Sequence, residues 1–283
     1  MDNTNQKKRL VEFQLAEPPF RAGDVAIVGA GPGDPGLLTL RALMLIQQAD
    51  VVLHDRLVSP QVMELVNPAA ECLHVGKFSG NHCVPQADTN ALLTTRAQQQ
   101  QRVVRLKGGD PYILGRGGEE AEYLMEQGVH FQVVPGITSA SGCASQCGLP
   151  LTHRDHAQSV TFVTGHRKAD QSLDLDWAAL ATPKQTCVFY MGLSNAGAIT
   201  HNLMHHGVPG SCPVALIERG TTDQQRMAVT TLAELPHTAE RDQFHPPTLI
   251  IVGEVVALAD KLAPSQSKQS RPPITRAHQG VLS

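Results

Sequence analysis

Short apolar runs rich in β-branched residues alternate with longer segments of helical periodicity through the first half of the chain. The apolar runs predict strands at residues 24–28, 51–54, 71–75, 102–106 and 131–134. The periodic segments predict helices at residues 37–48, 60–66, 87–100, 117–127 and 138–146. This alternation favours a parallel sheet with helices on its faces.

A second series of the same kind follows, and the segment VVPGITSASG (133–142) between the two series predicts a domain junction. Strands are expected near 159–164, 186–191, 213–218, 226–230 and 248–252, and helices near 194–206 and 254–262. We therefore expect an α/β fold with two α/β/α domains, residues 23–136 and 137–263, and a ligand cleft between them. The polar, proline-bearing ends predict a flexible segment 1–22 and a disordered tail 264–283.

Composition narrows the class of protein. The chain has 283 residues, 41% of them hydrophobic, which is enough for a real core, and its formal net charge is −3. No global basic field points to nucleic acid. No run of about 18 apolar residues predicts a membrane span, and the N-terminus lacks the apolar core of a secretory signal. Six cysteines show no C-x-x-C pair, so we expect free thiols in a reducing cytoplasm.

The stretch GAGPGDPG (29–36) follows the first predicted strand and contains G-x-G-x-x-G at glycines 31, 33 and 36. A dinucleotide cradle needs backbone N–H groups aimed at the phosphates. Pro32 and Pro35 have no N–H group, and Asp34 adds a negative charge, so the loop is a poor diphosphate site. Asp55, 24 residues after Gly31, stands near where an acid would accept a ribose hydroxyl, and it keeps the dinucleotide alternative open. A tight turn without any ligand is the other alternative.

A second glycine cluster lies in VVRLKGGDPYILGRGGEE (103–120), after the fourth predicted strand. Gly108 and Gly109 permit a ligand to approach the backbone closely. Asp110 stands at the carboxyl end of the strand, where it can bind a cation, an amine or a hydroxyl. Glu119 and Glu120 also suit the start of a helix, where the dipole favours acids. Two glycine loops at strand ends of one sheet favour a ligand site there.

Four blocks, in this order and spacing, resemble the tetrapyrrole methylase family: VGAGPGDPGLLTL, RLKGGDPYILGRGGEE, VVPGIT and GLPLTHRD. The resemblance covers roughly residues 23–260. Three more blocks, DVVLHDRLVS, VGK and THRDHAQSVTFVTGH, are most similar to the members that C-methylate uroporphyrinogen III. The resemblance implies two α/β domains and S-adenosylmethionine as the methyl donor, in a class III S-adenosylmethionine-dependent methyltransferase. This cofactor has a sulfonium, an amine, a carboxylate and a ribose but no phosphate, which suits the first loop.

Carried over residue by residue, the resemblance implies a set of cofactor contacts made largely by backbone groups. They are Pro32, Gly108, Gly109, Asp110, Ile113, Thr138, Ser139, Met191 and Gly220. The implied substrate is uroporphyrinogen III, methylated at C2 and C7 to precorrin-2, for siroheme, cobalamin or heme d1. Its eight carboxylates need cations that offer several donors. The implied substrate-binding residues are Arg56, Arg116, His153, Arg154 and Met191, with Lys77 a further candidate cation.

The family pattern also implies the acid–base groups and the assembly. Asp55 is the leading general base and Lys77 its partner acid, while Arg116 and Glu119 form a second candidate pair. Relatives imply a homodimer. Siroheme synthases fuse a dehydrogenase–chelatase module ahead of such a methylase, and the roughly 22 residues before the first strand are too few for it. We therefore expect methyl transfer alone.

Other classes of function have weaker support in the sequence. His201 and His205 are four residues apart with His206 beside them, but no acidic partner motif accompanies them, so an exposed helix face is expected rather than a metal site. An NAD-dependent dehydrogenase would bind NAD in place of the methyl donor. A non-catalytic scaffold would keep the sheet but has no use for Asp55 and Lys77 beside two glycine loops.

Overall fold

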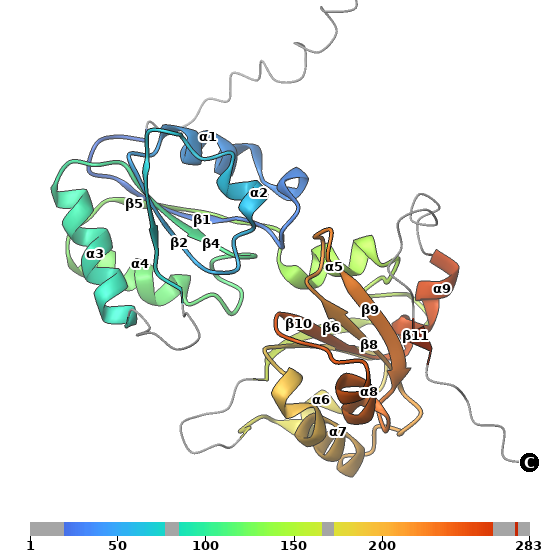
Figure 1. Ribbon diagram of the computed structural model, residues 1–283. Helices are drawn as coiled ribbons and strands as arrows, with labels where there is room; N and C mark the ends of the chain where they lie inside the picture. Colours follow the sequence, from blue (N-terminus) through green and yellow to red (C-terminus); the bar gives the residue numbers. More distant parts are fainter. Residues whose placement is uncertain (1–19, 77–84, 166–172, 263–274, 277–283) are drawn as a thin grey trace, which may run out of the picture.

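The computed structural model describes residues 20–76, 85–165, 173–262 and 275–276 (Figure 1). Almost all of the segment 1–22 and of the tail 264–283, together with Lys77, lies outside the described residues. Every strand expected from the sequence is present, and its ends shift by at most one residue. The α/β prediction is confirmed.

The first sheet contains five parallel strands in the order β3-β2-β4-β1-β5. They are β1 (Val25–Gly29), β2 (Val51–His54), β3 (Glu71–His74), β4 (Val103–Lys107) and β5 (Phe131–Val134). Because the strands are parallel, all of their carboxyl ends meet at one edge of the sheet. The loops after β1 and β4 are neighbours there, since these two strands are adjacent.

Helices cover both faces of this sheet, so its strands are apolar on both sides. They are α1 (Leu40–Gln48), α2 (Pro60–Met63), α3 (Gln86–Gln98) and α4 (Gly117–Glu126). One core layer joins α1 and α2 to the sheet, and the opposite layer joins α3 and α4. In Figure 1 these two pairs lie on opposite sides of the strands.

The start of α1 differs from the expected residue 37 for a local reason. Asp34 caps a 3-10 turn, η1 (Pro35–Leu37), by accepting a hydrogen bond from the Gly36 N–H at 2.7 Å. The chain is then extended at Leu38 and Thr39, and the Thr39 hydroxyl accepts a bond from Ala42 N–H at 3.1 Å. Thr39 is therefore the N-cap that sets the first turn of α1.

The second sheet is mixed, with the strand order β11-β9-β8-β10-β7-β6. Its strands are β6 (Ser159–Thr164), β7 (Gln185–Tyr190), β8 (Pro213–Glu218), β9 (Arg226–Thr231), β10 (Thr248–Val252) and β11 (Thr275–Arg276). The pairs of β7 with β10, β10 with β8 and β8 with β9 are antiparallel, while the two outer pairs are parallel. Only β8 and β9 among the antiparallel pairs follow each other directly in the chain, joined by a short link.

Helices and 3-10 turns also cover both faces of the second sheet. They are α5 (Ser139–Gln146), α6 (Trp177–Leu180), α7 (Ala196–His205), α8 (Leu235–Arg241) and α9 (Ala259–Leu262), with turns η2 (Leu193–Asn195) and η3 (Glu254–Leu258). One layer joins α6, α7 and α8 to the sheet, and the other joins α5, η3 and α9. The short α6 and α8 were not expected from the sequence.

The chain passes from the first sheet to the second just after β5. The next helix, α5, packs on the second sheet through Ala140, Cys143 and Cys147. The crossing therefore falls in residues 135–138, inside the segment expected to be the junction. The domain limits at residues 136 and 137, and the ligand cleft between the halves, stay predictions.

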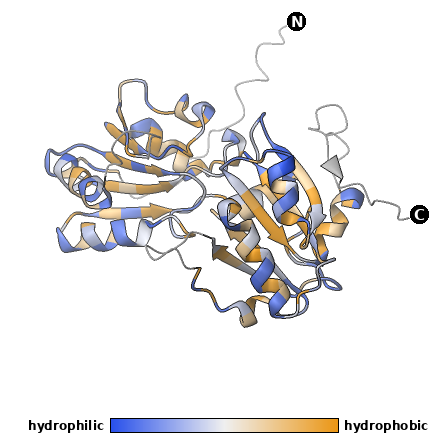
Figure 2. Cartoon of the chain, turned by 60° about the horizontal axis from the view of Figure 1, so that its bottom comes forward, coloured by the Kyte–Doolittle hydropathy of each residue, from blue (hydrophilic) through white to orange (hydrophobic). Residues whose placement is uncertain are grey.

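The hydropathy of the chain follows these layers. Figure 2 shows mainly hydrophobic strands inside each half and helices that carry hydrophilic stretches. Across the described ranges, no helix is both long enough and apolar enough to cross a bilayer.

Candidate active site

The two glycine loops are hydrogen-bonded to each other at the carboxyl edge of the first sheet. Gly109 N–H donates to the Gly31 carbonyl at 2.7 Å, and Gly31 N–H donates to the Gly109 carbonyl at 3.1 Å. Both residues have a φ of +71°, in the left-handed region that favours glycine. The two glycine loops, both expected at strand ends of one sheet, are therefore joined directly by this bridge.

Most N–H groups of the first loop and of the turn that follows it are already used inside the protein. Six of them donate to protein acceptors: those of Ala30, Gly31, Asp34, Gly36, Leu37 and Leu38. Pro32 and Pro35 have no N–H group to offer. A diphosphate needs such donors to be free, so this geometry weighs against the dinucleotide alternative.

The first loop also contacts the second half of the chain. Asp34 N–H donates to the Thr221 hydroxyl at 3.2 Å. A Cβ built on Gly142, in α5, would lie 2.5 Å from Pro32 Cγ, and one on Gly33 would lie 2.7 Å from Thr222 Cγ2. Glycine is therefore required at both positions for this close approach. The first loop is thus one of the places where the two halves touch.

Asp110 ties the second glycine loop to the crossing after β5. Its Oδ1 accepts a hydrogen bond from Tyr112 N–H at 2.8 Å, and its Oδ2 accepts one from Gly136 N–H at 3.0 Å. Asp110 is a buried residue, with 9% of its surface exposed. It organises the loop from within, and its contact with a cofactor stays a prediction.

Thr138 and Ser139 begin α5 beside the second glycine loop. A Cβ built on Gly109 would lie 3.7 Å from Ser139 Oγ, which is ordinary contact. The Thr138 hydroxyl and the Tyr190 hydroxyl are 2.6 Å apart, and Ala140 N–H donates to the Tyr190 oxygen at 3.0 Å. Burial raises the pKa of Tyr190, so the phenol is neutral. Sequence reasoning missed Tyr190, although it directly precedes Met191.

Replacing Tyr190 with Phe should lower the free energy of unfolding by about 1–3 kcal/mol, because Ala140 N–H and Thr138 lose a buried partner. The ring itself stays, so its edge contact with Phe162, at 5.9 Å between centroids, is kept. Urea unfolding followed by circular dichroism measures the change. Tyr112→Phe is the control, since that side chain is 58% exposed. Equal losses in the two variants would contradict this role for Tyr190.

Three further cofactor candidates follow strands in the same region. Met191 follows β7 with a φ of +54° and is 54% exposed. Gly220 follows β8, and a Cβ there would lie 2.0 Å from Cys143 Sγ in α5, so only glycine fits. Gly108 packs on the loop after β2, where a Cβ would lie 2.8 Å from Leu57 Cβ. Ile113 is half-buried in the second glycine loop.

Asp55 directly follows β2 and belongs to a buried ionic cluster that the sequence did not predict. Its Oδ1 lies 2.5 Å from Arg105 Nη2, and its Oδ2 lies 4.0 Å from Lys107 Nζ. Glu120 Oε1 lies 2.9 Å from Arg105 Nε and 3.0 Å from Lys107 Nζ. The Asp55 side chain is 29% exposed, whereas the other three are nearly or fully buried. Asp55 is therefore the only member of the cluster through which solvent or a ligand has appreciable access.

The environment of this cluster changes the basicity of its cations. Burial lowers the pKa of Lys107, and the neighbouring charge of Arg105 lowers it further. Burial also opposes the charge of Arg105, but Asp55 and Glu120 outweigh that effect and raise its pKa. Arg105 therefore stays charged. The sequence feature that could have pointed to this buried ionic cluster is the pair of cations inside the apolar strand VVRLK.

Arg116 and Glu119 form a pair, as the second acid–base candidate requires, but the pair is exposed. Arg116 Nε and Nη2 donate to the two Glu119 oxygens at 2.9 and 2.7 Å. The side chains are 57% and 55% exposed. The hydrogen bond from Arg116 lowers the pKa of Glu119, so Glu119 is a carboxylate at neutral pH. Glu120, the next residue, is the buried acid.

The candidate substrate cations come from different parts of the chain. Arg56 is exposed beside the end of β3, where a Cβ on Gly76 would lie 2.6 Å from Arg56 N. His153 and Arg154 lie in the turn before β6. His153 N–H donates to the Ala157 carbonyl at 2.9 Å, and Asp155 N–H donates to His153 Nδ1 at 3.2 Å. Both of these hydrogen bonds stay within the turn.

Large apolar side chains are exposed around the strand ends. Such side chains favour contact with a partner or ligand when they gather on one surface. They follow β2, β4, β5 and β7: Leu57, Tyr112, Leu114, Ile137 and Met191. These positions would suit a ligand with a large apolar body and polar edges.

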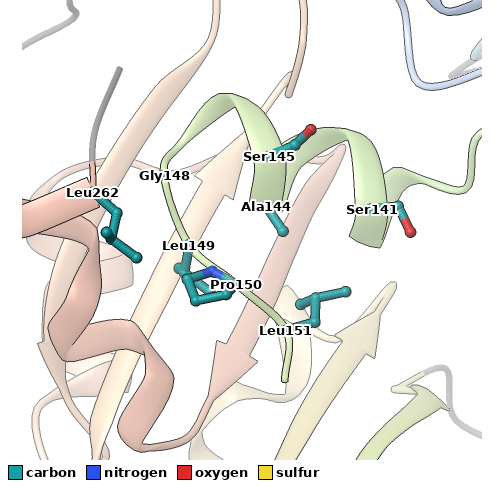
Figure 3. A pocket seen from close by; sticks show the side chains of 8 residues that line it. All are labelled: Ser141, Ala144, Ser145, Gly148, Leu149, Pro150, Leu151 and Leu262. Atoms are coloured by element: carbon teal, nitrogen blue, oxygen red, sulfur yellow. The ribbon is translucent and has the colours of Figure 1, made fainter. Parts of the chain in front are cut away.

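A hollow of about 420 Å³ lies elsewhere, along the C-terminal half of α5 (Figure 3). Its walls are Ser141, Ala144, Ser145, Gly148, Leu149, Pro150, Leu151 and Leu262. None of the residues predicted to bind cofactor or substrate lines it. As for metals, no group of three or more suitable ligands occurs within the described part of the chain, and the rings of His201 and His205 stack at 6.2 Å.

Two siroheme synthases are similar in sequence to most of this chain. A siroheme synthase from Azotobacter vinelandii is 58% identical over 94% of this chain and 57% of its own length. A siroheme synthase 3 from Aeromonas hydrophila subsp. hydrophila is 59% identical over 90% of this chain and 54% of its own. The chain thus spans a little over half the length of these relatives.

Solved structures match along nearly their full length. The uroporphyrin-III C-methyltransferase from Thermus thermophilus is 40% identical, with a TM-score of 0.72, covering 86% of this chain and 97% of its own. The same enzyme complexed with S-adenosyl homocysteine has 39% identity, a TM-score of 0.71 and coverage of 82% and 93%. A cobalt precorrin-4 methyltransferase is 27% identical, with a TM-score of 0.74, over 85% and 99%.

The family that these likenesses suggest also matches directly. Residues 24–236 match the tetrapyrrole (corrin/porphyrin) methylases. This range contains both glycine loops, Asp55, the buried cluster and the start of α5. The chain therefore belongs to the tetrapyrrole methylase family.

Proposed function

We propose that this protein transfers methyl groups from S-adenosylmethionine to C2 and C7 of uroporphyrinogen III, giving precorrin-2. The observation that carries the proposal is the likeness to a uroporphyrin-III C-methyltransferase over 97% of that enzyme's chain. The same enzyme has been solved with S-adenosyl homocysteine, the product of such a donor. The exposed apolar side chains at the strand ends and the nearby cations also suit a large ring with acidic edges.

The residues present fit S-adenosylmethionine better than a dinucleotide. Most N–H groups of the first loop are occupied, and a methyl donor without phosphate has no need of them. The lack of a side chain at Gly142 brings Pro32 of the first loop close to α5, and the same lack at Gly220 brings the chain after β8 close to Cys143 of α5. When bound, the donor supplies a methyl group on a positively charged sulfur. The proposed contacts are Pro32, Gly108, Gly109, Asp110, Ile113, Thr138, Ser139, Met191 and Gly220.

Asp55 is the proposed general base. One of its oxygens is held by Arg105, and its side chain is exposed enough to reach a ligand. It accepts the proton that the substrate loses when a ring carbon gains the methyl group. Lys77, the proposed partner acid, lies outside the described residues. Arg116 and Glu119 are exposed as a pair, so we assign Arg116 to substrate carboxylates and keep Glu119 as its anchor.

Binding of the macrocycle falls to the remaining candidates. Arg56, Arg116, His153 and Arg154 would hold its carboxylates, since cations with several donors bind such groups best. Met191 would contact the ring. The proposal includes a homodimer in the cytoplasm, which light scattering after gel filtration and cell fractionation would test. Siroheme, cobalamin and heme d1 formation all fit as the downstream route.

Incubation with uroporphyrinogen III and S-adenosylmethionine should yield a product that has gained two methyl groups, seen by mass spectrometry. Calorimetry should show binding of S-adenosyl homocysteine and none of NAD. The physical reason is that Pro32 and Pro35 have no N–H group and that the donors named above are occupied, which leaves the first loop poor in N–H groups for a diphosphate. An unmodified tetrapyrrole, or NAD binding in place of the methyl-donor product, would contradict the proposal.

A further inference from the structure

Arg105, a buried residue of β4, forms a hydrogen-bonded ion pair with Asp55. Its Nη2 donates to Asp55 Oδ1 at 2.5 Å, and its Nε donates to Glu120 Oε1 at 2.9 Å. Its Nη1 donates to the carbonyls of Leu53 and Leu106 at 3.4 and 3.3 Å. All three nitrogens are therefore used, and the side chain is 4% exposed. The plane of the guanidinium has no freedom to turn.

Glu120 is the counter-ion that keeps Arg105 in place. Its side chain is fully buried, and its Oε1 also receives hydrogen bonds from Lys107 Nζ and Gln86 Nε2, each at 3.0 Å. Its Oε2 is buried without a hydrogen-bond partner among the described residues. A buried oxygen without a hydrogen-bond partner lowers the free energy of unfolding. Two cations and two acids balance the charge of the cluster.

Stability alone is a weak reason for such a cluster. Replacing buried ion pairs by apolar residues of similar size is often neutral or stabilising, because desolvation offsets the attraction. The cluster has one partly exposed member, Asp55, and that residue follows β2 at the carboxyl edge of the first sheet. The buried groups are therefore arranged around a carboxylate that can reach a ligand.

We propose that Arg105 is a positioning residue that anchors Asp55 Oδ1, so that Oδ2 is presented to the substrate, with Glu120 holding Arg105. The inference rests on the proposed function, in which Asp55 is the base. Arg105 keeps the carboxylate from rotating between turnovers, which pre-organises the proton transfer. A lysine cannot replace it, because an ammonium lacks the planar fork that bonds Asp55, Glu120 and the carbonyls together.

The charges around Asp55 give the inference a signature in pH. The charged groups that contact Asp55 or its partners are Arg105 and Lys107 from β4 and Glu120 from α4. His54 precedes Asp55 at the end of β2, and its ring contacts that of His74 at the end of β3. Burial lowers the pKa of His54. The Arg105 cation attracts the Asp55 carboxylate, whereas the Glu120 charge repels it, so removing one or the other should change the pH profile in opposite directions.

The experiment compares Arg105→Lys, Arg105→Gln and Glu120→Gln in the full chain. Arg105→Lys should lower kcat about 10²-fold, as expected for a misplaced catalytic group, while KM and S-adenosyl homocysteine affinity change little. Arg105→Gln removes a cation that favours the Asp55 carboxylate, so it should move the acidic limb of the kcat profile to higher pH. Glu120→Gln should move it to lower pH. Shifts of the same sign, or none, would overturn the inference.

Arg102→Lys is the matched control. Arg102 directly precedes β4, the strand that carries Arg105, and pairs with Asp50. Its Nη2 and Nε donate to the Asp50 oxygens at 2.7 and 3.1 Å. This variant should keep the wild-type kcat and pH profile. Comparable losses in Arg102→Lys and Arg105→Lys would show that Arg105 acts through general stability, against the inference.

A double variant separates this inference from the proposed function. Because Arg105 acts through Asp55, Arg105→Lys should add little to the loss already caused by Asp55→Asn. Multiplied losses would overturn the positioning role. If the wild-type chain transfers no methyl group, the proposed function fails. If it does and Arg105→Lys retains its kcat, only this inference fails. Binding of S-adenosyl homocysteine by each variant verifies that it has folded.

Discussion

Asp55→Asn is expected to lower kcat for methyl transfer by about 10²–10⁴-fold, the usual contribution of a general base. Asparagine keeps the shape of the side chain, and its carbonyl oxygen can still accept the bond from Arg105 Nη2. It cannot take a proton from the substrate. The glycine loops and α5 do not depend on this carboxylate, so affinity for S-adenosyl homocysteine should change little. Single-turnover kinetics and calorimetry measure the two quantities separately.

Asp50→Asn is the matched control for this prediction. Asp50 directly precedes β2 as Asp55 directly follows it, and each pairs with an arginine of the same region, Arg102 or Arg105. The hydrogen bond from Arg102 lowers the pKa of Asp50 in the folded protein. Losing the Asp50 charge should therefore reduce the free energy of unfolding at pH values above the pKa of Asp50 in the unfolded chain, without changing kcat. Unchanged turnover in Asp55→Asn would remove Asp55 as the base.

The strands were predictable because each one is a short apolar run, and parallel order in the first half follows from alternation with helices. The second half gave equally clear strands, yet its antiparallel order depends on which edges pair, and periodicity carries no information about pairing. The helix α6 (Trp177–Leu180) is too short for periodicity to detect. Local rules thus located the elements but not their neighbours.

The acid–base residues show the same limit. Asp55 was proposed as the base through the family pattern, and its position at a strand end, where parallel sheets bind ligands, agrees with that proposal. Arg105 and Lys107 were not predicted, because a cation inside an apolar run says nothing about the acid that faces it. Glu119 and Glu120 are adjacent in the sequence and alike in charge. Only packing shows that Glu119 is exposed and Glu120 fully buried.

Gly136→Ala is expected to be the most disruptive exchange of a single small residue at the crossing. A Cβ there would lie 2.2 Å from the Gly109 carbonyl oxygen and 2.8 Å from Gly29 Cα. Both are backbone atoms at strand ends, so no flexible side chain can move aside. Overpacking of this kind should lower the free energy of unfolding by about 3 kcal/mol. Urea unfolding measures it.

The same exchange should also impair the site, because Gly136 N–H is the partner of Asp110 Oδ2 and Gly109 faces Ser139. A backbone shift of about 1 Å at these positions can lower kcat about 10²-fold, and affinity for S-adenosyl homocysteine should fall with it. Gly197→Ala, in α7 where nothing lies within 4 Å, is the control and should be neutral or slightly stabilising. Should Gly136→Ala unfold and turn over like Gly197→Ala, the close contact between the two glycine loops and the crossing would not be what holds the site together.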